Sequence, residues 1–133
     1  MLRSARMAEV IRFKTRMFDV TKERPNPINP IRGESLLLWL AQKTKDNPSI
    51  SQPDTEDWGW YAHVDWHGRS YMLGACAYDE ENGPNEWVLQ IEKQRSLMER
   101  LRGKETMNPE DECVKFFLEL IKAEPEFSEV SVD

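Results

Sequence analysis

Apolar and polar residues alternate along four stretches of this chain, and a period of two predicts strands that bury one side. The alternation covers residues 11–17, 58–66, 69–78 and 87–91. In the first stretch the odd positions hold Ile, Phe, Thr and Met while the even positions are basic, which is typical of a half-buried strand. Two valines within 130–132 leave open a short final strand at the C-terminus.

The two middle stretches are predicted to form a hairpin. His67 and Gly68 fit a two-residue turn, because glycine readily adopts the positive φ that such a turn requires. The turn sets the pairs 66–69, 64–71, 62–73 and 60–75, and the buried side then holds Trp60, Ala62, Val64, Tyr71, Leu73 and Ala75. Alternation puts Trp58 and Trp66 on the same side as Trp60. We favour a core role for these tryptophans over an exposed aromatic platform for sugar rings, and for Trp58 and Trp66, at the ends of the strand, a rim position stays open.

Helical spacing appears on either side of this hairpin. Residues 33–46 place Leu36, Leu37 and Leu40 on one face, and Asn47-Pro48 ends the helix. A second helix is predicted to begin at Asn108, which would cap it, with proline at the first position and acidic residues at its positive end. The core stripe of this helix comprises Cys113, Phe116, Phe117, Leu120 and Ile121. Between the sheet and this helix, Leu97, Met98 and Leu101 indicate one or two short helical turns.

These elements follow one another in the order β-α-β-β-β-α, with the final strand left open. The order predicts an α+β fold, a two-layer sandwich in which an antiparallel β-meander sheet carries two helices on one face. The 133 residues suit one hydrophobic core, so we expect a single domain over 9–133 preceded by a flexible leader over 1–8. Met7 is an alternative start within that leader.

Composition restricts the class of protein further. No apolar run approaches the roughly 20 residues that span a bilayer, so no membrane association is expected. Two cysteines are too few for a disulfide framework, and we expect a cytoplasmic protein with reduced thiols. The net charge of −6 disfavours wholesale binding of phosphate groups. Charge is unevenly distributed: +5 over 1–32, −8 over 33–92, +4 over 93–104 and −7 over 105–133.

Candidate chemistry centres on the only two histidines, His63 and His67, which flank Asp65. His63 and Asp65 share a strand side about 7 Å apart, whereas His67 lies in the turn. No second cluster of His or Cys completes a metal site, and no phosphate loop or nucleophile motif is present. Cys76 has no neighbour that would activate its thiol. The sequence therefore predicts no cofactor and no bound metal, and it favours a protein that is not an enzyme.

The outer side of the predicted hairpin is unusually apolar for a face turned to water. It carries Tyr61, His63, Asp65, Met72 and Tyr78, the residue types that are typical of a partner-binding surface. An alternative is that residues 25–32, or the segment after Gln94, cover this side.

The sequence therefore predicts a small acidic protein-binding module that acts through its sheet face, with a protein partner and with a homodimer left open. In size, charge and architecture the chain resembles small acidic bacterial α+β proteins that bind and inhibit toxins or phage-defence enzymes. That resemblance implies an inhibitor or immunity-type role. One alternative is a small enzyme or ligand-binding domain using His63 and Asp65. A second is nucleic-acid binding through Arg12, Lys14, Arg16 and the basic segment 93–104.

Overall fold

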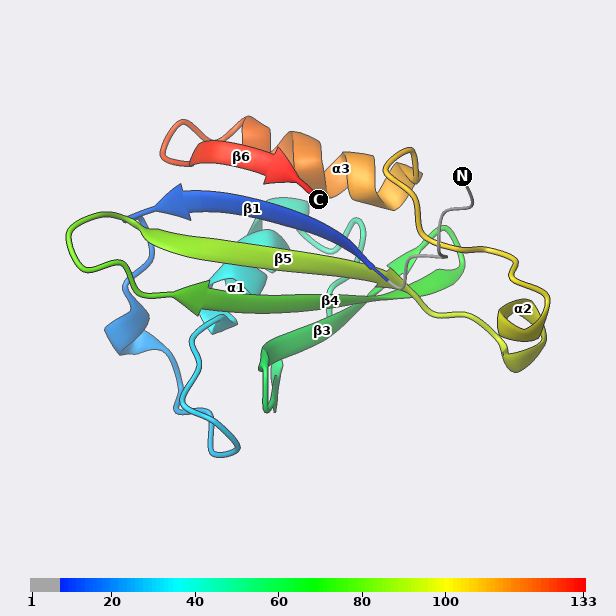
Figure 1. Ribbon diagram of the computed structural model, residues 1–133, viewed down its shortest axis with the longest axis horizontal. Coiled ribbons are helices and arrows are strands. Elements are labelled where there is room, and N and C mark those ends of the chain that lie inside the picture. The colour runs from blue at the N-terminus through cyan, green and yellow to red at the C-terminus, as the bar shows by residue number, and fades with distance from the viewer. Residues whose placement is uncertain (1–7) are drawn as a thin grey trace.

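The computed structural model describes residues 8–133. Six antiparallel strands form one sheet in the order β2-β3-β4-β5-β1-β6, accompanied by three α-helices (Figure 1). The elements are β1 (Glu9–Thr15), α1 (Glu34–Thr44), β2 (Asp54–Glu56), β3 (Gly59–Trp66), β4 (Arg69–Tyr78), β5 (Asn85–Lys93), α2 (Leu97–Leu101), α3 (Glu112–Lys122) and β6 (Ser128–Val132). The predicted α+β architecture is confirmed. No helix in the described part of the chain is long and apolar enough to cross a membrane.

The β3–β4 hairpin has the predicted register. Trp60 pairs with Ala75, Ala62 with Leu73, Val64 with Tyr71 and Trp66 with Arg69. His67 and Gly68 form the turn with φ angles of 51° and 85°, and the Asp65 side chain accepts a hydrogen bond from the Gly68 N–H at 3.0 Å. Two consecutive positive φ angles are what a two-residue turn needs to match the twist of the strands it joins.

One face of the sheet carries the hydrophobic core. Side chains at alternate positions of β1, β3, β4 and β5 point to this face, and α1 and α3 pack over it (Figure 1). The largest fully buried side chains come from both layers: Trp60, Trp87, Phe13, Phe117, Ile11, Leu36, Leu37, Leu40, Leu73, Leu89, Ile91 and Ile121. We call this the helix side of the sheet and the opposite side the outer face.

The start of α1 lies very close to the sheet. A Cβ atom at Gly33 would stand 2.3 Å from the Ala75 carbonyl oxygen, so only glycine fits there. Because glycine has no side chain to cap the helix, Glu23 supplies the acceptor from the preceding loop. Its carboxylate accepts from the Gly33 N–H at 3.0 Å and from the Ser35 N–H at 2.8 Å. A carboxylate at this end also interacts favourably with the helix dipole.

The bounds of two elements differ from what the sequence indicates. The helix α3 begins at Glu112 and its cap is Asp111, whose carboxylate accepts from the N–H groups of Cys113 and Val114. Asn108 instead stabilises a preceding turn by accepting from the Glu110 N–H. Both residue types can cap a helix, but Asp111 also bonds groups on the sheet, and these tertiary contacts select it.

The second difference concerns residues 49–56, whose polar, proline-containing sequence is typical of a loop. Their last three residues form the edge strand β2, which pairs with the beginning of β3. The segment is polar and contains proline, so its sequence lacks the alternation of a half-buried strand. The last three residues form a strand because they pair with β3, although the local sequence pattern does not predict a strand there.

Candidate functional site

The five residues predicted to bind a partner all lie on the outer face of the sheet. His63 pairs with Met72 and Asp65 pairs with Ser70 across β3 and β4, while Tyr61 lies opposite Gly74. Tyr78, at the end of β4, is 54% exposed. His63 and Asp65 are also exposed, whereas Tyr61 and Met72 are half-buried. Because side chains alternate across a strand, this group faces away from α1 and α3.

Neither of the two segments expected as alternative covers lies over this group. In the first, the Ile31 carbonyl accepts a hydrogen bond from Trp60 Nε1 at 3.1 Å, and Trp60 belongs to the helix side. In the segment after Gln94, the Glu99 carboxylate accepts a hydrogen bond from Arg69. Arg69 pairs with Trp66 at a position of the hairpin that faces the helix side. Figure 1 shows no helix on the outer face. Within residues 8–133 the candidate face is therefore open.

Trp58 is on a different side of the sheet from the one expected. The turn between β2 and β3 interrupts the strand before Gly59, so the alternation that places Trp60 does not extend to Trp58. The half-buried Trp58 indole lies against Gly74, where a Cβ atom would stand only 2.7 Å from the ring. Trp58 is therefore an additional member of the outer face. The signal for it in the sequence is a glycine within a strand, which often marks close approach of another group.

Two of the half-buried residues of the face, Tyr61 and Met72, lie opposite carboxylates. Asp54 lies opposite Tyr61 across β2 and β3, and Glu92 lies opposite Met72 across β4 and β5. Asp65 adds a third carboxylate near the hairpin turn, and we call Asp54, Asp65 and Glu92 the acidic rim of the face. Carboxylates at these positions attract positive charge.

The basic residues of β1 lie on the same face but are paired. Arg12 bonds Asp133 at 2.7 Å and Glu86 at 3.2 Å, and the hydrogen bond that Arg12 donates to Asp133 raises the pKa of the Arg12 guanidinium. Lys14 lies 3.5 Å from Glu129. Basic and acidic segments of the chain thus neutralise one another here.

The second basic group starts on the opposite side of the sheet. Lys93 pairs with Tyr71 of the helix side and contacts Glu105 at 3.1 Å and Asp111 at 3.2 Å. Lys93 therefore lies on the opposite side of the sheet from Arg12 and Lys14.

His63 and Asp65 were the candidate residues for an enzyme or ligand-binding site. The rings of His63 and Tyr61 meet edge to face with centroids 5.7 Å apart. Asp65 is engaged in the turn through its bond to Gly68, and His67 packs against Trp66. Among residues 8–133, no group of three or more His, Cys, Asp or Glu side chains is arranged to hold a metal ion.

The two thiols are both buried. Cys76 is buried on the outer face, and this burial raises its pKa. Cys113 is fully buried on the helix side, where burial and the nearby Asp111 carboxylate raise its pKa to about 12. Both thiols are protonated at neutral pH, which gives neither of them the reactivity of a thiolate nucleophile.

Comparison with family models, curated proteins and solved structures gives no significant match to this chain.

Proposed function

We propose that the protein is a protein-binding module whose outer sheet face docks onto a basic surface of a partner protein. The observation that carries this proposal is an open sheet face with Trp58, Tyr61, Met72 and Tyr78 where polar residues are usual. Aromatic residues and methionine are enriched in protein interfaces, whose rims are polar. A small acidic protein with such a face is suited to act as an inhibitor or immunity-type protein.

The position of these side chains on a sheet favours binding. Strands β3, β4 and β5 are paired on both sides, so their side chains are held on a rigid surface. Trp58 is further fixed by its contact with Gly74. Little conformational entropy is then lost when a partner covers the face, and more of the contact energy is available for affinity.

Alanine substitution on the outer face is expected to weaken binding without unfolding the protein. Affinity capture from the native host followed by mass spectrometry identifies the partner, and calorimetry measures the affinity. We expect Tyr61→Ala and Met72→Ala each to raise Kd by about tenfold or more, the effect of removing a central interface residue. The control is Leu38→Ala, an equally apolar exposed change on α1. Capture of a small molecule with no stoichiometric protein partner would overturn the proposal.

The acidic rim is expected to make association dependent on ionic strength. Screening acts over about 8 Å at physiological salt, so rim charges attract a basic partner strongly only in dilute buffer. Stopped-flow or surface plasmon resonance measurements should show an on-rate that falls steeply as salt is added. Glu92→Gln should flatten this dependence, while Asp46→Asn, next to α1, should leave it unchanged. An on-rate for the wild-type protein that does not vary with salt would contradict the electrostatic part of the proposal.

A further inference from the structure

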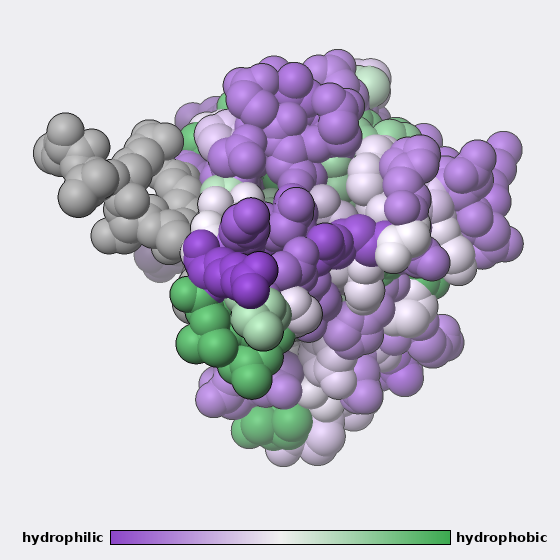
Figure 2. Space-filling view, turned by 90° about the vertical axis from the view of Figure 1, so that its right-hand side faces the viewer, coloured by the Kyte–Doolittle hydropathy of each residue, from purple (hydrophilic) through white to green (hydrophobic). Residues whose placement is uncertain are grey.

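The short helix α2 exposes an unusual amount of apolar surface. Leu97 is 73% exposed, Met98 56% and Leu101 74%, although each would stabilise the fold if it were buried. Figure 2 views the molecule from the side where α2 projects in Figure 1, and hydrophobic atoms gather there beside strongly hydrophilic ones. We call Leu97, Met98 and Leu101 the α2 knob.

The helix α2 is held firmly despite its length of five residues. Arg69 of β4 donates two hydrogen bonds to the Glu99 carboxylate, both at 2.9 Å. Ser96 and Glu99 also form a reciprocal capping box at the start of the helix. The bond from Arg69 is the main reason that the pKa of Glu99 is lowered to about 2. The knob is thus presented in a fixed position at neutral pH.

The surroundings of the knob are basic. Arg95, Arg100, Arg102 and Lys104 lie within or beside α2. Glu99 is the only acidic residue between 95 and 104, and Arg69 already compensates its charge. A surface that fits the knob therefore needs an apolar depression with an acidic border.

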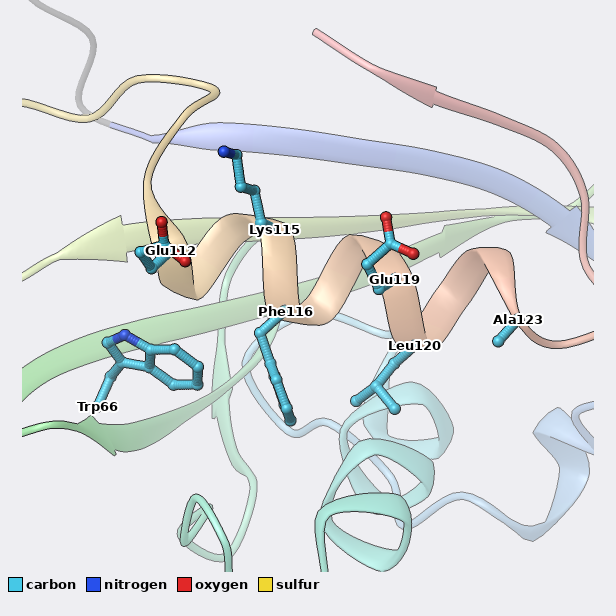
Figure 3. A pocket seen from close by; sticks show the side chains of 7 residues that line it. All are labelled: Trp66, Glu112, Lys115, Phe116, Glu119, Leu120 and Ala123. Atoms are coloured by element: carbon cyan, nitrogen blue, oxygen red, sulfur yellow. The ribbon is translucent and has the colours of Figure 1, made fainter.

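The helix side of the same chain offers such a depression. A groove of about 550 Å³ is lined by Trp66 of β3 together with Phe116 and Leu120 of α3 (Figure 3). Phe116 and Leu120 were expected to be core residues, but both are half-exposed, and the Trp66 and Phe116 rings lie 5.1 Å apart. Val114 takes a place in the core instead.

The border of this groove is acidic. Glu112 and Glu119 line it, and the one basic side chain among its lining residues, Lys115, is bound to Glu110 at 3.0 Å. The groove is apolar with an acidic border, and the α2 knob is apolar with basic surroundings, so the two surfaces are complementary. The volume is also within the range of about 300–1,000 Å³ that is usual for binding sites.

We propose that the groove formed by Trp66, Phe116 and Leu120 receives the α2 knob of a second copy of this chain. Each copy carries both surfaces, so two copies can exchange knobs in a closed two-fold dimer. Leucine and methionine side chains then leave water, and the arginines of one copy approach Glu112 and Glu119 of the other. This contact uses the helix side and the end of the molecule, so it is independent of the outer face proposed for the partner.

Sedimentation velocity over a range of protein concentrations tests the proposal. The wild-type chain should form dimers, and the knob variant Leu97→Ser/Leu101→Ser should raise the dissociation constant of the dimer at least about tenfold. Glu112→Arg/Glu119→Arg in the groove should do the same, and circular dichroism checks that each variant is folded. Leu38→Ser, which removes an exposed leucine from α1, is the matched control and should leave the dimer intact.

Combining variants identifies which surfaces meet. Mixing the knob variant with the groove variant should restore a heterodimer, because one intact knob can still enter one intact groove. Arg100→Glu/Arg102→Glu should dissociate the dimer, and adding Glu112→Arg/Glu119→Arg to the same chain should restore it.

Three results would overturn the proposal. The first is a wild-type chain that remains monomeric at every concentration. The second is a dimer that responds to knob variants but not to groove variants, which would indicate contact between two α2 helices. The third is a monomer that binds vesicles containing phosphatidylserine through Leu97 and Leu101, which would make the knob a membrane-surface element.

Discussion

Replacing Trp60 by alanine is expected to lower the free energy of unfolding by about 3–5 kcal/mol, the cost of removing a large aromatic side chain from a packed core. Trp60 is 1% exposed, and its ring lies beneath the Arg24 guanidinium at 5.3 Å. Its Nε1 group also donates a hydrogen bond to the Ile31 carbonyl, so the substitution leaves that acceptor without its donor. The loss is a large fraction of the roughly 5–15 kcal/mol that stabilises a domain.

The matched control is the next residue in the strand. Tyr61 points to the outer face and is half-buried, so Tyr61→Ala should cost much less stability than Trp60→Ala. The double variant His63→Ala/Asp65→Ala should also remain folded, because both side chains are exposed. Thermal and denaturant unfolding, followed by circular dichroism, compare the three proteins. If the Tyr61 variant unfolded and the Trp60 variant did not, the assignment of core and outer face would be wrong.

Removing the Asp111 carboxylate should have a comparable effect on stability, about 3–5 kcal/mol for Asp111→Ala. One oxygen of this buried side chain accepts from the Tyr71 hydroxyl at 2.9 Å and lies 3.2 Å from Lys93 Nζ. The other oxygen caps α3 through Cys113 and Val114. Alanine therefore removes a helix cap, leaves a buried hydroxyl without its acceptor and leaves a largely buried ammonium with one counter-ion fewer.

Two further variants separate these contributions. Asp111→Asn keeps an oxygen that can cap α3 but loses the charge beside Lys93, so it should be intermediate in stability. Glu110→Ala removes an exposed neighbouring carboxylate and should change stability by less than about 0.5 kcal/mol. Denaturant unfolding gives the three values. Equal stability of Asp111→Ala and Glu110→Ala would show that the contacts of Asp111 contribute little.

The sequence by itself determined the elements whose signals are local. The alternation of apolar and polar residues determined which side chains of β3 and β4 face the core. The requirement for positive φ angles determined the position of the hairpin turn at His67-Gly68. The pairing of one strand with the next then follows directly, since a two-residue turn permits only one register. The leucine spacing of α1 and the predicted outer-face residues rest on the same local information.

Only the tertiary structure decided the features that depend on residues far apart in the chain. The insertion of β1 between β5 and β6 brings Arg12 to Glu86 and Asp133, so the positive charge of Arg12 is paired with two carboxylates. The place of Trp58 depends on the space above Gly74 in another strand. The start of α3 depends on Tyr71 and Lys93, which favour Asp111 over Asn108 as the cap.

The groove beside Trp66 is the clearest example of a feature that only the tertiary structure decided. Helical spacing assigns Phe116 and Leu120 to the core stripe of α3. The spacing identifies the apolar face of a helix, but it does not show how much of that face the neighbouring elements cover. In the folded chain the inner part of that face, with Val114, Phe117 and Ile121, packs on the sheet. Its outer part stays open beside Trp66. An apolar stripe in the sequence therefore determined which side of α3 faces the sheet, and the packing of the sheet and helices decided how much of that side remained available for binding.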